Sequence, residues 1–488
     1  MHDTQPFALL VLLFAAVGLT AVLSNRLTAR VRVPAPALML IAAAVTVQVL
    51  PGLQPPREQT VERLVTIALV CILFDGGMHI GWARFRRAAA PIAAVGVLGT
   101  FLTVAAAAVL THLAFGLSWY LSILVATAVA PTDPAVVFSV LGQHQIFGRS
   151  GTILEGESGA NDPVGIALMA ALIGAGELSG GAAARVGLEF ALQMAVGAAV
   201  GVLGGRLLLG FSRRVPLPSE GLYPLRSLAC AFILFGAATL AHGSGFLAVF
   251  VAGIVLGDGR APYKREVERF HSTVASLGEI VAFVVLGLTV DLQVLSRADV
   301  WVPGLLLGLA LAVVIRPCCV GLCLAGARLS RNETAFVLFA GLKGAVPILL
   351  GSFILLARLP DAQRLYGIVI VVVVFSVVVQ GSLVPAATRL LRIPTRTVEL
   401  EPWALGVRLR DEPSGAHRFT VVADSPADRA TIQQLSQLPE DAWISLVVRD
   451  QKLLTVRPDS QLRAGDQVLV LGDPDREHVL RAIFERPR

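Results

Sequence analysis

Long apolar segments recur along the first 391 residues of the chain, separated by short polar loops. A bilayer core about 30 Å thick is crossed by about 20 apolar residues in a helix. Segments of roughly this length lie near 7–24, 35–50, 62–80, 90–113, 118–140, 152–175, 186–211, 224–241, 244–257, 273–292, 300–326, 333–357 and 364–391. The pattern predicts a polytopic α-helical membrane protein with about 13 transmembrane helices.

Basic residues gather in alternate loops of this pattern. They follow the first, third, seventh, ninth, eleventh and last segments, as Arg26, Arg30, Arg32, Arg84, Arg86, Arg87, Arg213, Arg214, Arg260, Lys264, Arg265, Arg269, Arg328, Arg331, Arg389, Arg392 and Arg396. Loops rich in lysine and arginine stay in the cytosol. We therefore expect a multi-pass membrane protein with its N-terminus outside and its C-terminus in the cytosol.

Two of the apolar segments contain helix breakers near mid-membrane. The fifth reads Ala130-Pro131-Thr132-Asp133-Pro134, and the twelfth reads Gly341-Leu342-Lys343-Gly344-Ala345-Val346-Pro347. Proline removes a backbone donor and glycine weakens a helix, and unwound backbone at this depth must face protein or water. Interrupted spans at matching places in two halves indicate an inverted-repeat transporter. The fifth and twelfth segments differ by seven, so segments 1–6 are expected to match 8–13.

A polar stretch, Gly156-Glu157-Ser158-Gly159-Ala160-Asn161-Asp162-Pro163, lies inside the sixth apolar segment. Ionisable groups at that depth are costly and indicate an ion or proton site. Ser158 and Asp162 are four residues apart and share a helix face, with Glu157 and Asn161 beside them. If Thr132 and Asp133 of the fifth segment meet this face, hydroxyl, carboxylate and freed carbonyl oxygens converge there.

Hard oxygen ligands suit an alkali cation or a proton, and a cluster without His or Cys argues against a transition metal. Burial raises the pKa of a carboxyl, and a bound cation lowers it again. One carboxylate can therefore hold either a proton or a cation, which is sufficient for antiport. We assign Asp162 as this carrier. Ser158 and Asn161 fit direct ligation and helix–helix hydrogen bonding equally well. Glu157 is expected to pair with a buried base, Lys343 or Arg316, because an unpaired buried charge is costly.

Other classes of protein fit the sequence less well. Gly156-Glu157-Ser158-Gly159 matches the short G-x-S-G of rhomboid-type intramembrane serine proteases, and His242 could supply a base. Rhomboids, however, have about half as many helices and do not need the adjacent carboxylates. A channel is disfavoured because no T-V-G-Y-G filter sequence is present. The prediction is a transporter and not an enzyme, without a cofactor and without a bound metal other than the transported ion.

Composition limits the classes of partner that the chain is expected to bind. Hydrophobic residues make up 55% of the chain and charged residues 15%, against about 25% charge in soluble proteins. The formal charge of +6 belongs to the membrane loops, because acidic residues slightly outnumber basic ones beyond Arg396. No nucleic-acid partner is expected. The five cysteines lie in apolar segments, which favours buried thiols over a disulfide framework or a metal site.

The polar C-terminal part predicts a small α+β domain. We expect a membrane domain over 1–395, a linker over 396–416 and a cytosolic domain over 417–488. Strands are expected at 418–423, 443–449, 453–457 and 467–472, with helices at 426–435 and 473–486. A module of this size has little core of its own, so we expect it to dimerise.

The membrane part resembles the cation:proton antiporters of the NhaP and NHE type. The resemblance is carried by the two interrupted segments, by the sixth-segment stretch from Leu154, and by Leu73-Phe74-Asp75-Gly76-Gly77 and His242-Gly243-Ser244-Gly245-Phe246-Leu247-Ala248. It implies that Asp162 is the proton- and ion-carrying aspartate and that Thr132, Asp133 and Ser158 lie at the ion site. It also implies that Glu157 pairs with a buried arginine.

Two further points follow from the same resemblance. The pair Asn161-Asp162 is typical of the electroneutral branch of the family. The family usually has arginine where this chain has Lys343, and lysine lacks the bidentate fork of arginine.

The C-terminal part resembles the TrkA-C (RCK C-terminal) domain through residues 445–450, Pro458, Leu462, Gly465-Asp466 and 468–472. Antiporters with both parts are similar to the CvrA-type K⁺/H⁺ antiporters of bacteria. This resemblance implies a homodimer of the bacterial inner (plasma) membrane that exports K⁺ in preference to Na⁺ and carries a small-molecule regulator on the C-terminal domain. The ligand types alone do not separate K⁺ from Na⁺. No G-x-G-x-x-G phosphate cradle is present, so nucleotide binding is not expected.

Overall fold

The computed structural model describes residues 19, 34–49, 56–141, 144–146, 148–176, 181–259, 261–397, 415–435, 438–439, 442–449 and 452–485. The predicted first helix, 7–24, apart from residue 19, and most of the predicted linker, 396–416, lie outside these residues. Contacts divide the chain into two compact units, Met1–Trp403 and Ala404–Arg488. Each unit is described by itself.

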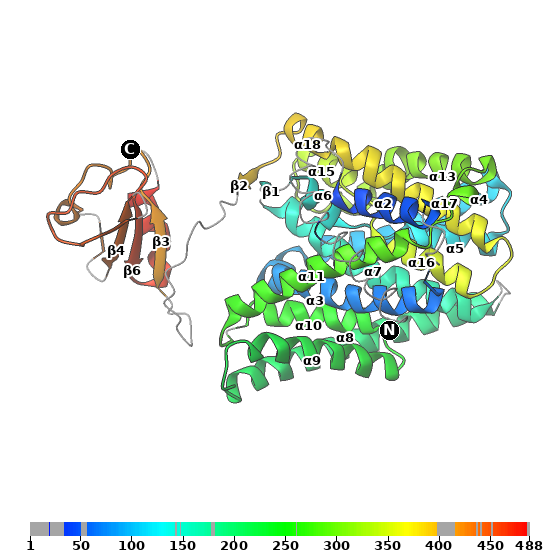
Figure 1. Ribbon diagram of the computed structural model, residues 1–488, viewed down its shortest axis with the longest axis horizontal. Helices are drawn as coiled ribbons and strands as arrows, with labels where there is room; N and C mark the ends of the chain where they lie inside the picture. The colour runs from blue at the N-terminus through cyan, green and yellow to red at the C-terminus, as the bar shows by residue number, and fades with distance from the viewer. Residues whose placement is uncertain are drawn as a thin grey trace, which may run out of the picture. The chain divides into compact units, whose positions relative to one another are not determined.

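The first unit is built of helices (Figure 1). Their bounds are α2 Ala35–Val49, α3 Glu58–Ala93, η1 Ala94–Gly99, α4 Thr100–Phe115, α5 Trp119–Val129, α6 Pro134–Leu141, α7 Arg149–Ala175, α8 Ala182–Arg214, α9 Leu222–Leu240, α10 Gly245–Gly257, α11 Lys264–Gly287, α12 Leu292–Leu295, α13 Ala298–Ala310, η2 Leu311–Ile315, α14 Arg316–Leu324, α15 Arg331–Phe339, α16 Ala345–Leu356, α17 Ala362–Val374, η3 Phe375–Gln380 and α18 Gly381–Leu390. Elements η1, η2 and η3 are π-helical turns.

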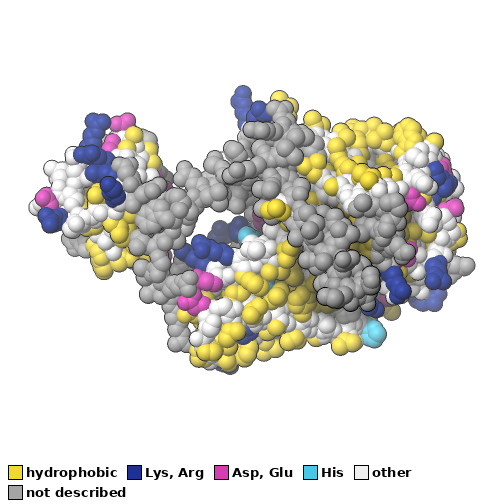
Figure 2. Space-filling model, in the orientation of Figure 1, with side chains coloured by type: hydrophobic (Ala, Val, Ile, Leu, Met, Phe, Trp, Pro, Cys, Tyr) yellow, Lys and Arg dark blue, Asp and Glu magenta, His cyan; other side chains and the backbone are white. Residues whose placement is uncertain are grey.

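The helical unit is a membrane protein fold. Seven helical stretches among the described residues are long and apolar enough to cross a membrane, and α2, α10 and α16 are shorter apolar helices. Hydrophobic side chains cover much of the face of the unit seen in Figure 2, and leucine and phenylalanine side chains are exposed along α8. Such a surface is stable against lipid and not against water. The predicted fold class is thereby confirmed.

One predicted pair of helices is joined. The segments at 62–80 and 90–113 form one helical stretch, Glu58–Phe115, which bends at Gly81, where φ is 65° and ψ is 162°. Glycine adopts this conformation without a Cβ clash. The side chain of Asp258 packs against Gly81 and accepts a hydrogen bond from the Ala83 N–H, so the bend is capped from α10.

Both predicted interruptions are present. The fifth span is divided into α5 and α6 around residues 130–133, and the twelfth into α15 and α16 around residues 340–344. A short two-stranded sheet was not predicted: β1, His144–Ile146, pairs antiparallel with β2, Thr395–Thr397. It ties the loop after α6 to the chain that leaves α18.

The second unit holds a four-stranded antiparallel sheet of order β3-β6-β4-β5. The strands are β3 Ala416–Thr420, β4 Trp443–Arg449, β5 Lys452–Leu454 and β6 Gln467–Leu471, followed by η5 Pro474–Arg476 and α19 Glu477–Phe484. The core forms between the sheet and α19, where Phe419 stacks on Phe484 at a ring-centroid distance of 5.5 Å. The α+β class is as predicted.

The predicted helix at 426–435 is wrong. This segment contains only a short 3₁₀ turn, η4 Ile432–Gln434. Its backbone bonds instead to residues far along the chain: the Arg429 N–H donates to the Leu462 carbonyl, and the Leu462 N–H donates to the Ala430 carbonyl. Long-range pairing therefore replaces the local helical bonds that the side-chain pattern suggested.

Candidate functional site

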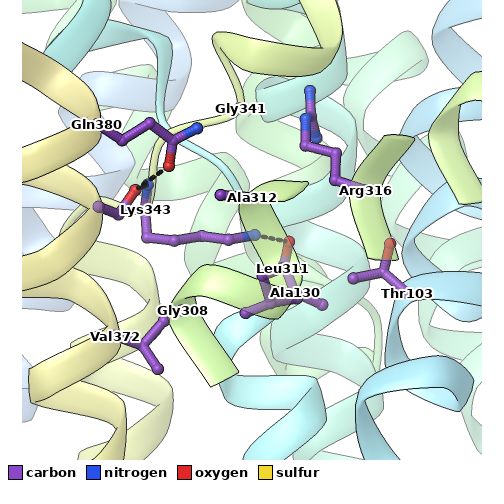
Figure 3. A pocket seen from close by; sticks show the side chains of 11 residues that line it. Thr103, Ala130, Gly308, Leu311, Ala312, Arg316, Gly341, Lys343, Val372 and Gln380 are labelled. Atoms are coloured by element: carbon purple, nitrogen blue, oxygen red, sulfur yellow. Dashed lines mark hydrogen bonds between the residues drawn. The ribbon is translucent and has the colours of Figure 1, made fainter. Parts of the chain in front are cut away.

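The two interruptions meet and bond to each other. The Asp133 N–H donates to the Leu342 carbonyl at 2.8 Å, and the Lys343 Nζ donates to the Ala130 carbonyl at 2.8 Å (Figure 3). Ala130 follows the last residue of α5, and the carbonyls at a helix C-terminus carry partial negative charge. The ammonium of Lys343 is therefore placed where two unwound segments cross.

Asp133 caps the half-helix α6 at this crossing. Its carboxylate accepts a hydrogen bond from the Ala135 N–H of α6 at 2.8 Å and lies against Gly344, which precedes α16. A carboxylate at a helix N-terminus satisfies free N–H groups and complements the helix dipole. Gly344 is required here, because a Cβ at that position would overlap the Asp133 carboxylate.

The predicted polar stretch lies on α7, which is held tightly by its neighbours. A Cβ at Gly156 would overlap Ile92, and one at Gly159 would overlap the ring of Phe250. Pro163 lacks the N–H that would bond the carbonyl four residues earlier, which leaves the Gly159 carbonyl without that partner. Close packing therefore fixes the helix that carries Asp162.

Asp162 is a buried acid whose carboxylate is not fully hydrogen-bonded within the described residues. It is 6% exposed, and one carboxylate oxygen, Oδ2, accepts a hydrogen bond from the Ser158 hydroxyl at 3.4 Å. The other, Oδ1, is buried without a hydrogen-bond partner among the described residues. The charged groups of Asp133 and Lys343 lie close enough to interact electrostatically with this carboxyl. A buried carboxylate oxygen with no partner is an acceptor available to a proton or a cation.

Asn161 and Thr132 bond to each other. The Asn161 Nδ2 donates to the Thr132 hydroxyl at 2.8 Å, and the Thr132 N–H donates to the Asn161 Oδ1 at 3.4 Å. The Thr132 hydroxyl donates in turn to Glu157 at 3.3 Å. Asn161 of α7 is thus hydrogen-bonded to the first interruption, and hydrogen bonding is one of the two roles that the sequence left open for it.

Glu157 forms a buried bidentate ion pair with Arg316. The two guanidinium nitrogens Nη1 and Nη2 lie 2.6 and 2.9 Å from the two carboxylate oxygens. Arg316 also donates to the carbonyls of Val337 and Leu338 at the end of α15. Its guanidinium lies against Gly341, where any Cβ would overlap it. Five donors in a rigid fork can serve a carboxylate and two carbonyls at once.

Of the two bases that the sequence offered as partners for Glu157, Arg316 forms the ion pair and Lys343 does not. The Lys343 ammonium bonds instead to the C-terminal end of α5, and the Lys343 backbone N–H donates to the Ser376 hydroxyl at 2.9 Å. The reason is geometric. The fork of Arg316 matches both oxygens of a carboxylate, whereas a single ammonium is satisfied by a helix-end carbonyl.

Two residues of the site were missed by the sequence analysis. Ser376 and Gln380 lie in the π-helical turn η3, and Gln380 donates to the Phe339 carbonyl at 2.6 Å. They line a cavity of about 10 Å³ next to Lys343, Arg316 and Thr103 (Figure 3), close to the volume of one water molecule. A glutamine at the end of the apolar run 368–379 was the available signal.

The serine-protease alternative lacks its base. Ser158 is buried and its hydroxyl bonds to Asp162. His242 is exposed just beyond the end of α9, with φ at 56°, and no hydrogen bond joins it to Ser158 within the described part of the chain. In the same part, no group of three or more His, Cys, Asp and Glu side chains could hold a metal ion.

Comparisons with known proteins match both units. Residues 11–390 match the family described as sodium/hydrogen exchanger, transmembrane, and residues 416–485 match the TrkA-C domain. The chain is 33% identical to the K(+)/H(+) antiporter NhaP of Alkalimonas amylolytica over 469 residues, which is 95% of this chain and 81% of that protein. It is 31% identical to the K(+)/H(+) antiporter NhaP2 of Shewanella oneidensis, over 86% of this chain and 73% of that protein.

Two further proteins are similar over the membrane part. The Na(+)/H(+) antiporter NhaH of Halobacillus aidingensis is 26% identical, over 78% of this chain and 97% of that protein. The solved structure of the sodium proton antiporter MjNhaP1 from Methanocaldococcus jannaschii has a TM-score of 0.64 at 20% identity, covering 78% of this chain and 98% of that one. This last likeness concerns the fold.

Proposed function

The chain belongs to the sodium/hydrogen exchanger family, and from that premise we propose that it exchanges a monovalent cation for a proton by alternating access around Asp162. One observation carries the proposal: Asp162 is buried at the crossing of two interrupted helices with Oδ1 unpartnered among the described residues. Binding a proton and binding a cation are then mutually exclusive at this carboxylate, and exchange follows from that exclusion.

The charges around Asp162 support a one-for-one exchange. Glu157 is neutralised by Arg316, Asp133 caps the N-terminus of α6, and Lys343 bonds to the C-terminal end of α5. Each of these three charged groups has a fixed partner, whereas one carboxylate oxygen of Asp162, like one of Glu279 on α11, has no hydrogen-bond partner among the described residues. At Asp162 one proton or one monovalent cation compensates the same single negative charge, which makes this exchange electroneutral.

The inverted-repeat arrangement supports alternating access. The crossing joins the fifth span to the twelfth, and these spans occupy matching places in the two halves. The bonds between Asp133 and Leu342, and between Lys343 and Ala130, link one half of the protein to the other. Movement of one half against the other would expose Asp162 to each side in turn, with the proton or cation bound during the change.

We propose K⁺ as the favoured cation, because two relatives that match 86% or more of this chain are named K(+)/H(+) antiporters. Na⁺ is the alternative, supported by the third relative. In proteoliposomes with an imposed proton gradient, added K⁺ is expected to move protons and to dissipate the gradient at lower concentration than Na⁺ does. A pH-sensitive dye inside the vesicles measures this. If neither cation moves protons, the proposed function is wrong.

We place the protein in the bacterial inner membrane as a homodimer, with the N-terminus outside and the C-terminal domain in the cytosol. Alternate loop basicity supports the orientation. The TrkA-C match supports a regulatory site for a small molecule on the C-terminal domain.

Ending the chain at residue 403 keeps the β1–β2 pair and removes the TrkA-C domain. The shortened protein is expected to retain cation-driven proton movement, because the described bonds around Asp162 lie within the first unit. Its dependence on pH or on added cytosolic metabolites is expected to change. The dye assay measures both properties. Loss of all exchange from a folded, membrane-inserted truncation would show that the domain is required for transport.

A further inference from the structure

The second interruption is fastened at both ends by side chains from η3. At one end, the Gln380 Nε2 donates to the carbonyl of Phe339, the last residue of α15, at 2.6 Å. At the other end, the Ser376 hydroxyl accepts the Lys343 N–H at 2.9 Å. The Ser376 hydroxyl also donates to the Gln380 Oε1 at 3.2 Å, which joins the two ends (Figure 3).

We propose that Gln380 and Ser376 are positioning residues that hold the second interruption in the conformation in which the ion site is assembled. The inference rests on the exchange activity proposed above. Their bonds run from residue 339 to residue 343, so they span the unwound segment. We refer to this hydrogen-bonded pair, Ser376 and Gln380, as the η3 clamp.

The hydrogen bonds to the last carbonyls of α15 support a specific role for the clamp. Helix α15 ends inside the protein, so its last carbonyls need partners from elsewhere. Arg316 serves Val337 and Leu338, and Gln380 serves Phe339. Without Gln380, the Phe339 carbonyl would lose its bond at a site where Gln380 itself is 6% exposed.

The clamp also determines where Lys343 and Leu342 point. Lys343 is held by its backbone N–H to Ser376, and its side chain extends from there to Ala130. The preceding carbonyl, of Leu342, accepts the Asp133 N–H. Both bonds between the two interruptions therefore begin at residues that the clamp fixes.

The first interruption has a matching device. There the Asn161 amide of α7 bonds to both the N–H and the hydroxyl of Thr132. Helix α7 is the span after the first interruption, and the α17–η3–α18 stretch is the span after the second. An amide side chain on the following span fastens the unwound segment in each half, as expected for two structurally related repeats.

The clamp differs from Asn161 in one respect. Asn161 precedes the carrier Asp162, whereas Gln380 has no acid as its neighbour in the sequence. Its role is therefore to position the second interruption and not to bind the ion. The π-helical turn that carries both residues is the kind of irregularity found at functional sites.

This role predicts an effect on KM. When the clamp is lost, the interruption samples conformations in which the site is not assembled, and the apparent affinity falls by the fraction of competent molecules. Each lost hydrogen bond is expected to change the equilibrium between assembled and unassembled conformations by roughly fivefold. A residue that only aids folding would instead lower the amount of active protein, which lowers Vmax and leaves KM unchanged.

The experiment compares polar and apolar side chains of similar shape at positions 380 (Gln and Met) and 376 (Thr and Val). The proteoliposome assay is used, with K⁺ as the cation. Gln380→Met removes both polar atoms and is expected to raise the KM by about tenfold, with Vmax per folded protein within about twofold. Ser376→Val is expected to raise the KM about fivefold, whereas Ser376→Thr, which keeps the hydroxyl, should stay within about twofold of wild type. Folded protein is quantified by size-exclusion chromatography.

Matched controls are available at positions away from the clamp. Gln193→Met on α8, where the amide bonds to Glu189, and Ser382→Val on α18, where the hydroxyl bonds to Val379, should leave the KM unchanged. If Ser376→Val and Gln380→Met lower Vmax without changing the KM, the clamp has only a structural role and the inference is overturned. If Ser376→Thr and Ser376→Val behave alike, the hydroxyl is not used and the inference also fails.

The two proposals fail in different ways. Absence of cation-driven proton movement in the wild-type protein would overturn the proposed function itself. Normal exchange in the wild type together with an unchanged KM in the clamp variants would overturn the positioning role alone.

Discussion

Replacing Asp162 with asparagine is expected to abolish cation-driven proton movement and to leave the protein folded. Asparagine has the shape of the aspartate but neither a negative charge nor a carboxyl that takes up a proton, so both binding steps are lost together. The Ser158 hydroxyl can still bond to the amide oxygen in place of Oδ2. In the proteoliposome assay the signal should fall to that of vesicles without protein, with either K⁺ or Na⁺.

We expect Asp162→Asn to keep its fold because of the hydrogen-bonding state of Oδ1. Because that oxygen has no hydrogen-bond partner among the described residues, exchanging it for an amide group breaks no bond seen in the structure. Removal of a buried charge also removes a desolvation cost. Thermal unfolding in detergent should therefore show the variant to be at least as stable as the wild type.

Asp299→Asn is the matched control. Asp299 lies in the first turn of α13, is 43% exposed, and pairs with Arg297 at 2.9 Å. The same chemical change at this position should leave transport unaltered. Cation-driven proton movement that persists in Asp162→Asn would show that another group carries the ion, and the proposed mechanism would then be wrong.

The sequence indicated where the helices break but not how the breaks are held. Proline and glycine act on their own backbone, so Pro131, Pro134, Gly341 and Gly344 predicted both interruptions from local properties alone. The cost of burying acids likewise indicated the polar stretch around Asp162. These inferences need no knowledge of neighbours in space.

Choices among partners depended on distances that a sequence does not contain. Lys343 and Arg316 were equal candidates for Glu157, and only the packing of the guanidinium against Gly341 separates them. Ser376 and Gln380 were missed because serine and glutamine in an apolar helix are neutral and inexpensive to bury once bonded. The wrong helix at 426–435 has the same cause, since its backbone bonds to 458–462 replace local ones.

Replacing Arg316 with methionine is expected to be the most destabilising single change at the site. It would leave Glu157, which is 2% exposed, charged and without its bidentate partner, and it would free the carbonyls of Val337 and Leu338. Breaking a buried ion pair from one side costs about 3–5 kcal/mol. We expect a large fall in the midpoint of thermal unfolding in detergent and little folded protein after membrane extraction.

The double variant Arg316→Met/Glu157→Gln tests the cause of that loss. If the unpaired charge is responsible, neutralising Glu157 should recover part of the stability, so that the two changes are less than additive in a double-mutant cycle. Partial recovery is expected because the carbonyls of α15 still lack a donor. Arg297→Met, which breaks an exposed pair with Asp299, serves as the control and should change stability little. Full additivity in the cycle would contradict a coupled ion pair, and an Arg316→Met protein as stable as this control would show that Arg316 does not hold α7 to the end of α15.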